Sequence, residues 1–422
     1  MKKKRPGLKQ KELVKTKLKN GLSIIIRYIP SDPISSCHLF LPGGAQIEPN
    51  SQKGISALMW SLLLKGTTAR SSKQLAEDIE SIGAHIGAMA TQDYSQVSCH
   101  SISDYFTEAL RMMSEVLFHP AYVPTEVEKE RAVLLAAIQA KKENIFTVAS
   151  EELNRHLYGD HPYAQPTSGT DETASKLNPG DLHRWHDHVV IPKGGVLSIT
   201  TNLTFKPLMK ELNNLFGPAL WPDTQARKKL PSKTPDYPKT SVSIERKDPF
   251  EQAFLMEAFP APNVKSKDFV TLKVLTTLLG GGMSSRLFQA LREKEGLAYD
   301  VGAFFPSRKD GSAFVVYLGL QAARMEQAKK RIRELLSDIQ SEKVSETELA
   351  QVKSYIKGSF ILDNQTNSQR SYYLGWWHVL GLDASYGQVY LKKIGDVSVK
   401  DIQRAAKKYF SHPSVTVEIQ PK

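Results

Sequence analysis

Alternating hydrophobic and polar positions recur along the chain in short runs that predict β-strands. These runs lie at Ser23 to Tyr28, Cys37 to Leu41, Asp93 to Ser101, Val242 to Glu245, Ala253 to Ala258 and Ala313 to Gly319. The strands are followed by runs with helical spacing, near Tyr105 to Phe118 and Glu326 to Ile339. Strands followed by blocks of helices favour an α+β fold, in which helices cover largely antiparallel sheets.

The same pattern occurs twice. Leu177 to Arg184 reads Leu-Asn-Pro-Gly-Asp-Leu-His-Arg, and Val397 to Arg404 reads Val-Ser-Val-Lys-Asp-Ile-Gln-Arg. Each segment leads to a proline and then to an alternating run, Val196 to Thr200 in one case and Val415 to Ile419 in the other. Such repetition predicts two duplicated α/β sandwich domains.

Five prolines between Pro218 and Pro238 mark the middle of the 422 residues. Proline fixes φ and lacks a backbone donor, so this density predicts an extended linker. We expect a basic flexible N-terminal arm at 1–20, an N-terminal domain at 21–217, the linker at 218–240 and a C-terminal domain at 241–422. Two large domains agree with roughly 150 residues per domain.

Two further helices have features of their own. Thr125-x-x-Glu128 behind Pro124 predicts a capping box that opens a long helix running to about Glu143. The aromatic residues Tyr372, Tyr373, Trp376 and Trp377 lie together farther along. We interpret them as helix packing, with a chamber lining or a subunit contact as the alternative.

The formal charge of +12 arises mostly in the first 20 residues, which hold nine Lys or Arg and one acid. A solvated terminus accounts for such a run, and no nucleic-acid motif accompanies it, so we expect no nucleic-acid partner. Cys37 and Cys99 lie in apolar runs and are expected to be buried thiols rather than a disulfide. No apolar stretch is long enough for a transmembrane segment. The chain is expected to be cytoplasmic, or periplasmic if a signal was removed.

The segment Leu41-Pro-Gly-Gly-Ala-Gln-Ile-Glu-Pro-Asn, followed by Lys53 to Thr67, resembles the start of the pitrilysin/insulinase family of zinc metallopeptidases, the inverted zincins. In active members the next helix carries His-x-x-Glu-His, in which two histidines bind zinc and the glutamate activates its water. Here those positions read Ala57-Leu-Met-Trp60-Ser61. The family's third ligand corresponds to Ala137, while a supporting glutamate persists as Glu130.

Alanine has no donor atom, and tryptophan and serine are poor zinc ligands. The resemblance therefore implies that Ala57, Trp60, Ser61 and Ala137 are degenerate zinc positions, and that this chain holds no metal or other cofactor of its own. A fold of the mitochondrial-processing-peptidase type is implied as well.

The second half carries Gly280-Gly281-Gly282-Met-Ser-Ser-Arg-Leu-Phe-Gln-Ala-Leu-Arg292 and then Gly296-Leu-Ala-Tyr299. This run resembles the substrate-binding signature of the same family, a glycine-rich turn and an Arg-x6-Tyr pair. Gly296 is suited to end the helix in a left-handed conformation, with Tyr299 starting the next strand. In the family the pair donates hydrogen bonds to the substrate, and the tyrosine stabilises the oxyanion.

The resemblance thus implies a non-catalytic, substrate-binding subunit of a heterodimeric zinc peptidase, inactive alone. A homologous zinc-bearing subunit would supply the metal, and the substrates would be peptides. Two alternatives stay open: a structural or binding homologue with no role in proteolysis, and an active peptidase that uses displaced ligands.

Overall fold

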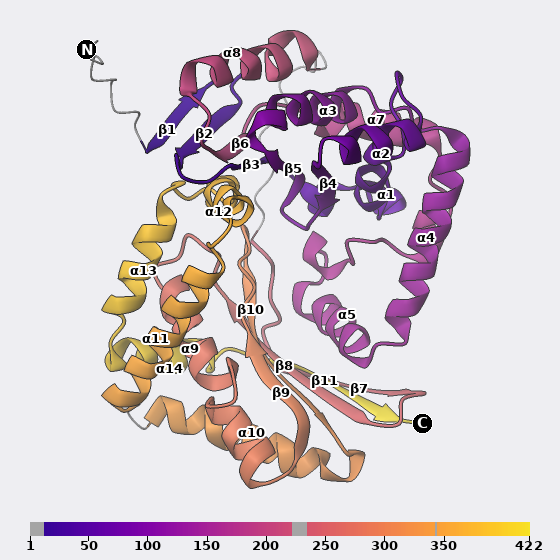
Figure 1. The fold of residues 1–422 in the computed structure, drawn as a ribbon. Helices are drawn as coiled ribbons and strands as arrows, with labels where there is room; N and C mark the ends of the chain where they lie inside the picture. Colours follow the sequence, from indigo (N-terminus) through magenta and orange to yellow (C-terminus); the bar gives the residue numbers. More distant parts are fainter. Residues whose placement is uncertain (1–11, 222–233, 342–343) are drawn as a thin grey trace, which may run out of the picture. The chain divides into compact units, whose positions relative to one another are not determined.

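The computed structural model describes residues 12–221, 234–341 and 344–422. They form two compact units, each built on one β-sheet (Figure 1). The first unit contains the described residues of Met1–Leu134, Thr167–Leu230 and Asp363–Ser385. The second contains those of Leu135–Pro166, Pro231–Leu362 and Tyr386–Lys422. Each unit therefore includes a segment from the opposite half of the sequence.

The first unit has a six-stranded sheet in the order β1-β2-β6-β3-β5-β4, antiparallel except for the parallel pair β2 and β6. Its elements in chain order are β1 (Leu13–Lys17), β2 (Ser23–Tyr28), β3 (Ile34–Pro42), α1 (Ile55–Ser61), α2 (Ser72–Ser81), β4 (His85–Ala90), β5 (Tyr94–Ile102), α3 (Phe106–Phe118), α4 (Pro124–Lys142), α6 (Asp171–Ala174), α7 (Pro179–Val189), β6 (Val196–Thr201), α8 (Phe205–Phe216) and α12 (Asn367–Val379). Helix α4 continues into the second unit after Leu134.

The second unit has a five-stranded sheet in the order β7-β11-β8-β10-β9, antiparallel except for the parallel pair β7 and β11. Its elements are α5 (Ile145–Tyr158), β7 (Val242–Asp248), β8 (Ala253–Ala261), α9 (Phe269–Gly280), a π-helical segment (Phe288–Lys294), β9 (Ala298–Phe304), β10 (Ser312–Leu320), α10 (Met325–Ser341), α11 (Glu346–Leu362), α13 (Tyr386–Asp396), α14 (Val399–Tyr409) and β11 (Val415–Pro421).

The two sheets repeat one topology. The order β2-β6-β3-β5-β4 matches β7-β11-β8-β10-β9 strand for strand, including the single parallel pair. Among the residues that the structure describes, only the edge strand β1 lacks a counterpart. The predicted pair of duplicated, helix-covered, largely antiparallel sheets is confirmed.

Part of the predicted N-terminal arm is a strand. Leu13–Lys17 pairs along its full length with β2, because its backbone groups can complete the edge of the sheet. The rest of the arm, 1–11, and residues 222–233 of the predicted linker lie outside the described residues. The boundaries proposed from the sequence stay predictions.

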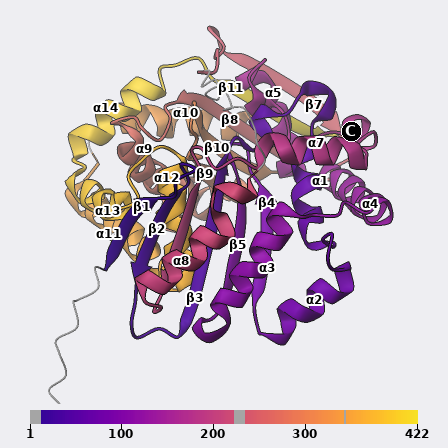
Figure 2. The ribbon, with the colours of Figure 1, turned by 90° about the horizontal axis from the view of Figure 1, so that it is seen from above.

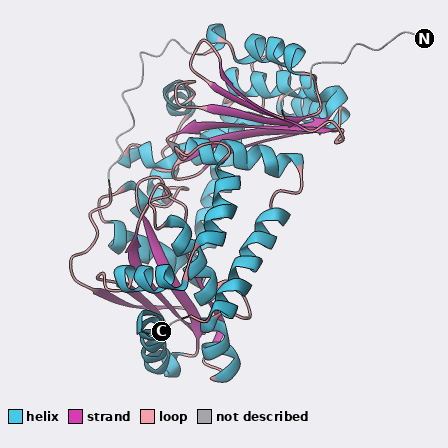
Figure 3. Cartoon of the chain, turned by 90° about the vertical axis from the view of Figure 1, so that its left-hand side faces the viewer, coloured by secondary structure: helices cyan, strands magenta, loops and turns pink. Residues whose placement is uncertain are grey.

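The first sheet is covered by helices on both faces (Figure 3). On one face α1, α3, α7 and α8 enclose the main apolar core, and Figure 2 looks down onto α3 and α8 above the strands. The core includes the inward side chains of the central strands, among them Leu39, Leu197 and Ile199.

Helix α12 covers the opposite face of that sheet, packing on β3 and β6. Trp377 is 3% exposed, and the Tyr372 hydroxyl lies 2.9 Å from that of Tyr94 on β5. Ser371 Oγ lies 2.9 Å from Nδ1 of the buried His38. Trp377 packs against the sheet as interpreted, and this sheet comes from the other half of the chain. Tyr372, Tyr373 and Trp376 are half-buried, and for them the interpretation stays a prediction.

Helix α5 packs on the second sheet as α12 packs on the first. Ala149, Leu153 and Leu157 pack against the inward residues of β8 and β11 and close an apolar core. Helices α9, α10 and α14 belong to its other side. Each sheet is therefore completed by one helix from the opposite half of the sequence.

The capping box at Thr125 was predicted wrongly. Helix α4 begins at Pro124, where the fixed φ of proline suits the first helical position, so Thr125 lies inside the first turn. Glu128 forms an ion pair with Arg131 one turn later.

The two cysteines are free and buried, as predicted. They lie opposite each other on β3 and β5, and burial raises the pKa of the Cys37 thiol well above its usual range. In the described part of the chain, no helix is both long and apolar enough to span a bilayer.

Candidate functional site

The positions that the resemblance assigns to a metal begin on α1. This helix starts at Gly54, and the buried Glu48 accepts hydrogen bonds from the backbone N–H groups of Gly54 at 2.9 Å and Ser56 at 2.8 Å. Burial raises the pKa of Glu48, although these donors oppose the shift. The carboxylate thus satisfies two backbone N–H groups at the buried N-terminal end of a seven-residue helix.

Trp60 is 1% exposed and packs in the main apolar core of the first unit. Its indole Nε1 has no hydrogen-bond partner among the described residues. Ala57 is half-buried, and Ser61 is exposed with its hydroxyl donating to the carbonyl of Leu58 at 2.9 Å. At these three positions α1 contributes packing and a local hydrogen bond.

The two positions on α4 differ from each other. Glu130 forms an ion pair with Lys65, 2.9 Å from carboxylate oxygen to ammonium nitrogen. Ala137 is exposed and lies in the part of α4 that belongs to the second unit. Glu130 is therefore a charged side chain already neutralised by a neighbour.

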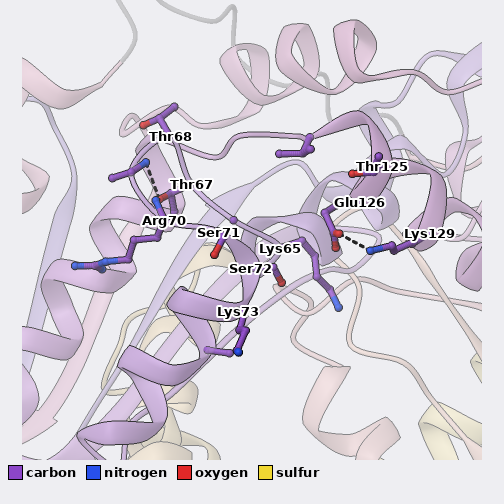
Figure 4. A pocket seen from close by; sticks show the side chains of 14 residues that line it. Lys65, Thr67, Thr68, Arg70, Ser71, Ser72, Lys73, Thr125, Glu126 and Lys129 are labelled. Atoms are coloured by element: carbon purple, nitrogen blue, oxygen red, sulfur yellow. Dashed lines mark hydrogen bonds and ion pairs between the residues drawn. The ribbon is translucent and has the colours of Figure 1, made fainter.

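Beside this ion pair, the first unit has a pocket of about 730 Å³ (Figure 4). Four cationic side chains line it together with several hydroxyls: Lys65, Arg70, Lys73 and Lys129, with Thr67, Thr68, Ser71, Ser72 and Thr125. Each cation has an acidic partner, as when Lys129 Nζ contacts Glu126 at 2.7 Å. The pocket is polar and close to charge balance, so it does not indicate an anion site.

Within the described ranges, no three or more histidine, cysteine, aspartate or glutamate side chains gather in a way that could hold a metal ion. The expectation that the chain carries no metal of its own stays a prediction, and metal analysis of the purified protein tests it.

Arg292, the first member of the predicted substrate pair, lies in the π-helical segment Phe288–Lys294 of the second unit. Its guanidinium carbon lies 5.0 Å from the centroid of the Phe288 ring, four residues earlier. No hydrogen bond or ion pair joins it to another residue in the described structure. Stacking on an aromatic ring limits the freedom of the exposed side chain and leaves all its N–H donors available.

The turn between Arg292 and Tyr299 is fixed by α10 and by the short turn that precedes it. Glu295 forms an ion pair with Arg331 at 2.7 Å, and Arg324 donates to the carbonyl of Gly296 at 3.1 Å. Gly296 has φ +58°, and β9 begins two residues later at Ala298. The predicted left-handed helix end and the position of Tyr299 at the start of a strand are confirmed.

Tyr299 occupies an irregularity in the pairing of β9 with β10. Gly319 lies opposite Asp300 and Leu320 opposite Ala298, so Tyr299 is an extra residue with no partner across the strand. A bulge of this kind redirects a side chain. The ring lies across Gly319, where a Cβ would come within 2.3 Å of Tyr299 Cζ, and the residue is 44% exposed.

The Tyr299 phenol keeps its proton at neutral pH. Partial burial and then the negative charge of Asp300 raise its pKa above the ordinary value. A neutral phenol can donate a hydrogen bond, which is what stabilisation of a developing oxyanion requires.

The predicted glycine-rich turn follows α9. A Cβ on Gly280 would lie 2.1 Å from the backbone nitrogen of Ala303, so glycine lets the helix end approach β9. Gly282 has open space around its Cα, and Gly281 ends the helix with its N–H donating to Thr277. The contact at Gly280 is structural, and a role of the three glycines toward a substrate stays a prediction.

The structure places Arg292 and Tyr299 on consecutive elements of one unit, both exposed. No hydrogen bond or ring contact joins the two side chains among the described residues. The sequence interpretation missed Phe288 and Gly319. The four-residue spacing of Phe288 and Arg292 was available as a signal, whereas the approach of Gly319 depends on strand register.

The fold defines a two-unit α+β protein with a duplicated sheet. Residues 23–171 match the family model for insulinase (peptidase family M16), and residues 176–356 match that for the peptidase M16 inactive domain. The chain belongs to peptidase family M16.

Curated relatives agree along most of their length. An uncharacterized zinc protease of Bacillus subtilis is 27% identical, over 83% of this chain and 85% of its own. An uncharacterized zinc protease of Rickettsia felis is 26% identical over 96% and 97%. A protein of Helicobacter pylori described as a non-peptidase homologue is 26% identical over 88% and 85%.

Solved structures show the same fold. A peptidase M16 inactive domain from Pseudomonas fluorescens superposes with a TM-score of 0.89 at 23% identity, covering 97% of this chain and 98% of that one. A protease from Helicobacter pylori superposes with the same TM-score at 21% identity, covering 97% and 99%.

Proposed function

We propose that this chain is the non-catalytic, substrate-binding subunit of a two-chain zinc peptidase, and that it supplies Arg292 and Tyr299 to a site completed by its partner. The partner would be a homologous subunit with His-x-x-Glu-His, and the substrates would be peptides. The match of residues 176–356 to the family's inactive domain supports the non-catalytic part.

The observation that carries the proposal is the state of Tyr299. Tyr299 is held at a bulge, rests on a glycine and is 44% exposed, so a large part of its ring is not used in packing. A side chain chosen for packing would point inward, as Trp60 does in the first unit. An exposed phenol that stays protonated is suited to donate to a substrate.

Arg292 is compatible with the same role. Its guanidinium stacks on Phe288 and carries donors that no described residue uses. Peptide backbone carbonyls are acceptors, so an added β-strand of substrate would offer partners at regular spacing. The partner subunit would supply zinc, the attacking water and the general base.

The test mixes the full-length chain with the subunit that carries His-x-x-Glu-His, taking first a candidate encoded by a neighbouring gene. Cleavage of a fluorogenic peptide is measured with the wild type, Tyr299→Phe and Arg292→Ala. We expect kcat to fall about 100-fold for Tyr299→Phe, the effect of removing one oxyanion donor. Arg292→Lys should recover part of the loss caused by Arg292→Ala.

Tyr355→Phe is the matched control, because Tyr355 is exposed in α11 of the same unit. It should leave the rate unchanged. If Tyr299→Phe and Arg292→Ala both behave like this control in a mixture that cleaves peptides, the shared-site proposal is wrong.

A structural or binding role without proteolysis is the second candidate, favoured by the Helicobacter pylori relative described as a non-peptidase homologue. It predicts that the chain never stimulates a zinc-bearing subunit. A third candidate, an active peptidase with displaced ligands, predicts about one equivalent of zinc in the purified chain.

A further inference from the structure

The second unit contains a polar cleft of about 650 Å³ that belongs to neither site described above. It lies between α10 and the face of the sheet formed by β7, β11 and β8. The charged residues that line it are Glu257, Lys329, Arg333 and Glu418, with His412 beside them, and its apolar lining residues include Leu255, Phe259 and Phe410.

The duplicated fold shows what occupies this place in the first unit. There β6 is followed by α8, which buries Leu208, Leu212 and Phe216 and packs on α3, the counterpart of α10. In the second unit the corresponding face of the sheet, beside β11, borders the cleft.

The residues on this face change from apolar to polar between the units. Leu39 pairs with Leu197 in the first sheet, and at the corresponding place Glu257 pairs with Thr416 in the second. Two residues farther along, Ile199 of β6 corresponds to Glu418 of β11. The cleft is therefore unsuited to a helix with an apolar face like α8.

The carboxylates of Glu257 and Glu418 are not simply charges on a solvent-exposed face of the sheet. Glu245 on the edge strand lies opposite Glu418 and is exposed, as expected for a charge on an uncovered face. The Glu418 side chain is only 7% exposed and contacts Lys329 at 2.8 Å. Glu418 is thus withdrawn from water in a concavity, where charges require partners, while Glu257 beside it is half-buried.

Glu257 has the weaker set of partners. Burial raises its pKa, opposed by a hydrogen bond from Ser414 and by the charge of Arg333. No ion pair within 4.0 Å joins it to another described residue. Arg333 itself is exposed at the mouth of the cleft. One acidic group inside and one basic group at the rim are thus both available to a ligand.

We propose that this cleft binds a small zwitterionic ligand, an α-amino acid or short peptide with an apolar side chain. Its ammonium group would contact Glu257, its carboxylate would contact Arg333, and its side chain would lie against the accessible edges of Phe410 and Phe259, which are 9% and 5% exposed. The apolar wall confers the preference, while the two charges fix orientation.

The test uses the full-length chain alone and measures binding of L-leucine and the dipeptide Leu-Leu by titration calorimetry. We expect saturable binding of at least one of them at one site per chain, weakened at least tenfold by Glu257→Gln and by Arg333→Gln. Leucinamide lacks the carboxylate and 4-methylpentanoate lacks the ammonium, so each should bind at least tenfold more weakly than leucine.

Glu245→Gln and Lys330→Gln are controls, since both residues are exposed and neither lines the cleft. Ser243→Trp fills the cleft from an exposed edge position and should abolish binding without disturbing the core. Absence of binding to the wild type, or equal affinity in Ser243→Trp, would overturn the proposal. The experiment needs no peptidase partner, so its result is independent of the function proposed for Arg292 and Tyr299.

Discussion

The ring of Tyr299 lies directly over Gly319 on the adjacent strand, so close that any side chain at Gly319 would occupy the volume of the phenol. The bulge in β9 and the glycine in β10 together determine where the hydroxyl points. The position of the Tyr299 ring therefore depends on a glycine of the neighbouring strand.

Gly319→Ala should displace the Tyr299 ring. We expect it to lower the free energy of unfolding by about 1–3 kcal/mol, because a Cβ is forced into occupied space. In the assay with the zinc-bearing subunit, Gly319→Ala should lower the cleavage rate, as Tyr299→Phe does. Gly358→Ala is the control: a Cβ there meets nothing within 4 Å in α11, so stability should rise by about 0.5–1 kcal/mol. Equal effects of the two substitutions would contradict the structural assignment.

Trp60 should matter for stability rather than for metal binding. Trp60→Ala leaves a cavity in the core of the first unit and should cost about 3–5 kcal/mol in urea unfolding. Tyr105→Ala removes an aromatic ring that is exposed in the same unit, and should cost far less. A Trp60→Ala protein as stable as the wild type would show that the side chain is not packed as described.

The contact of α12 with the first sheet should be sensitive to pH. Burial, and then the charge of His100, lower the pKa of His38 from its usual 6.5 to about 3. Between pH 6.5 and pH 3, His38 is therefore protonated in the unfolded chain but not in the folded one. The stability that the neutral His38 contributes above pH 6.5 is lost as the pH falls toward 3.

His38→Gln keeps a polar group near Ser371 but does not titrate. The drop in urea midpoint between pH 7 and pH 4 should be smaller in His38→Gln than in the wild type. Identical drops would mean that His38 does not contribute to the acid sensitivity.

The two thiols should be unreactive in the folded protein. Cys37 and Cys99 are fully buried, and the thiolate form of Cys37 is disfavoured. Titration with a thiol reagent should detect neither thiol under native conditions and both in denaturant. Rapid modification of either thiol without denaturant would indicate that the first sheet opens locally.

Much of the fold was predictable because its signals are local. The run of three isoleucines within Ser23–Tyr28 favours a strand, and its observed bounds are those predicted. The duplicated segments ending at Arg184 and Arg404 predict one topology twice. Gly296 alone was enough to predict the end of a helix, because few residues other than glycine adopt positive φ.

The chemical groups at the site could also be predicted from the sequence. Ala57 and Ala137 lack donor atoms in any structure, and Arg292 and Tyr299 carry their donors in any structure. The sequence did not predict the direction of the Tyr299 side chain, because the bulge at Tyr299 depends on the pairing of β9 with β10.

The sequence by itself thus determined the strands, the duplication and the chemical groups that each site can offer, because these follow from short-range pattern and residue type. Only the tertiary structure decided that α5 and α12 each complete the sheet of the opposite half. The sequence of an amphipathic helix shows that one side is apolar, but it does not show which sheet that side will pack against. It also decided that Glu257 and Glu418 lie in a cleft while Glu245 is solvated. Burial depends on what packs over a strand, and alternation alone does not state this.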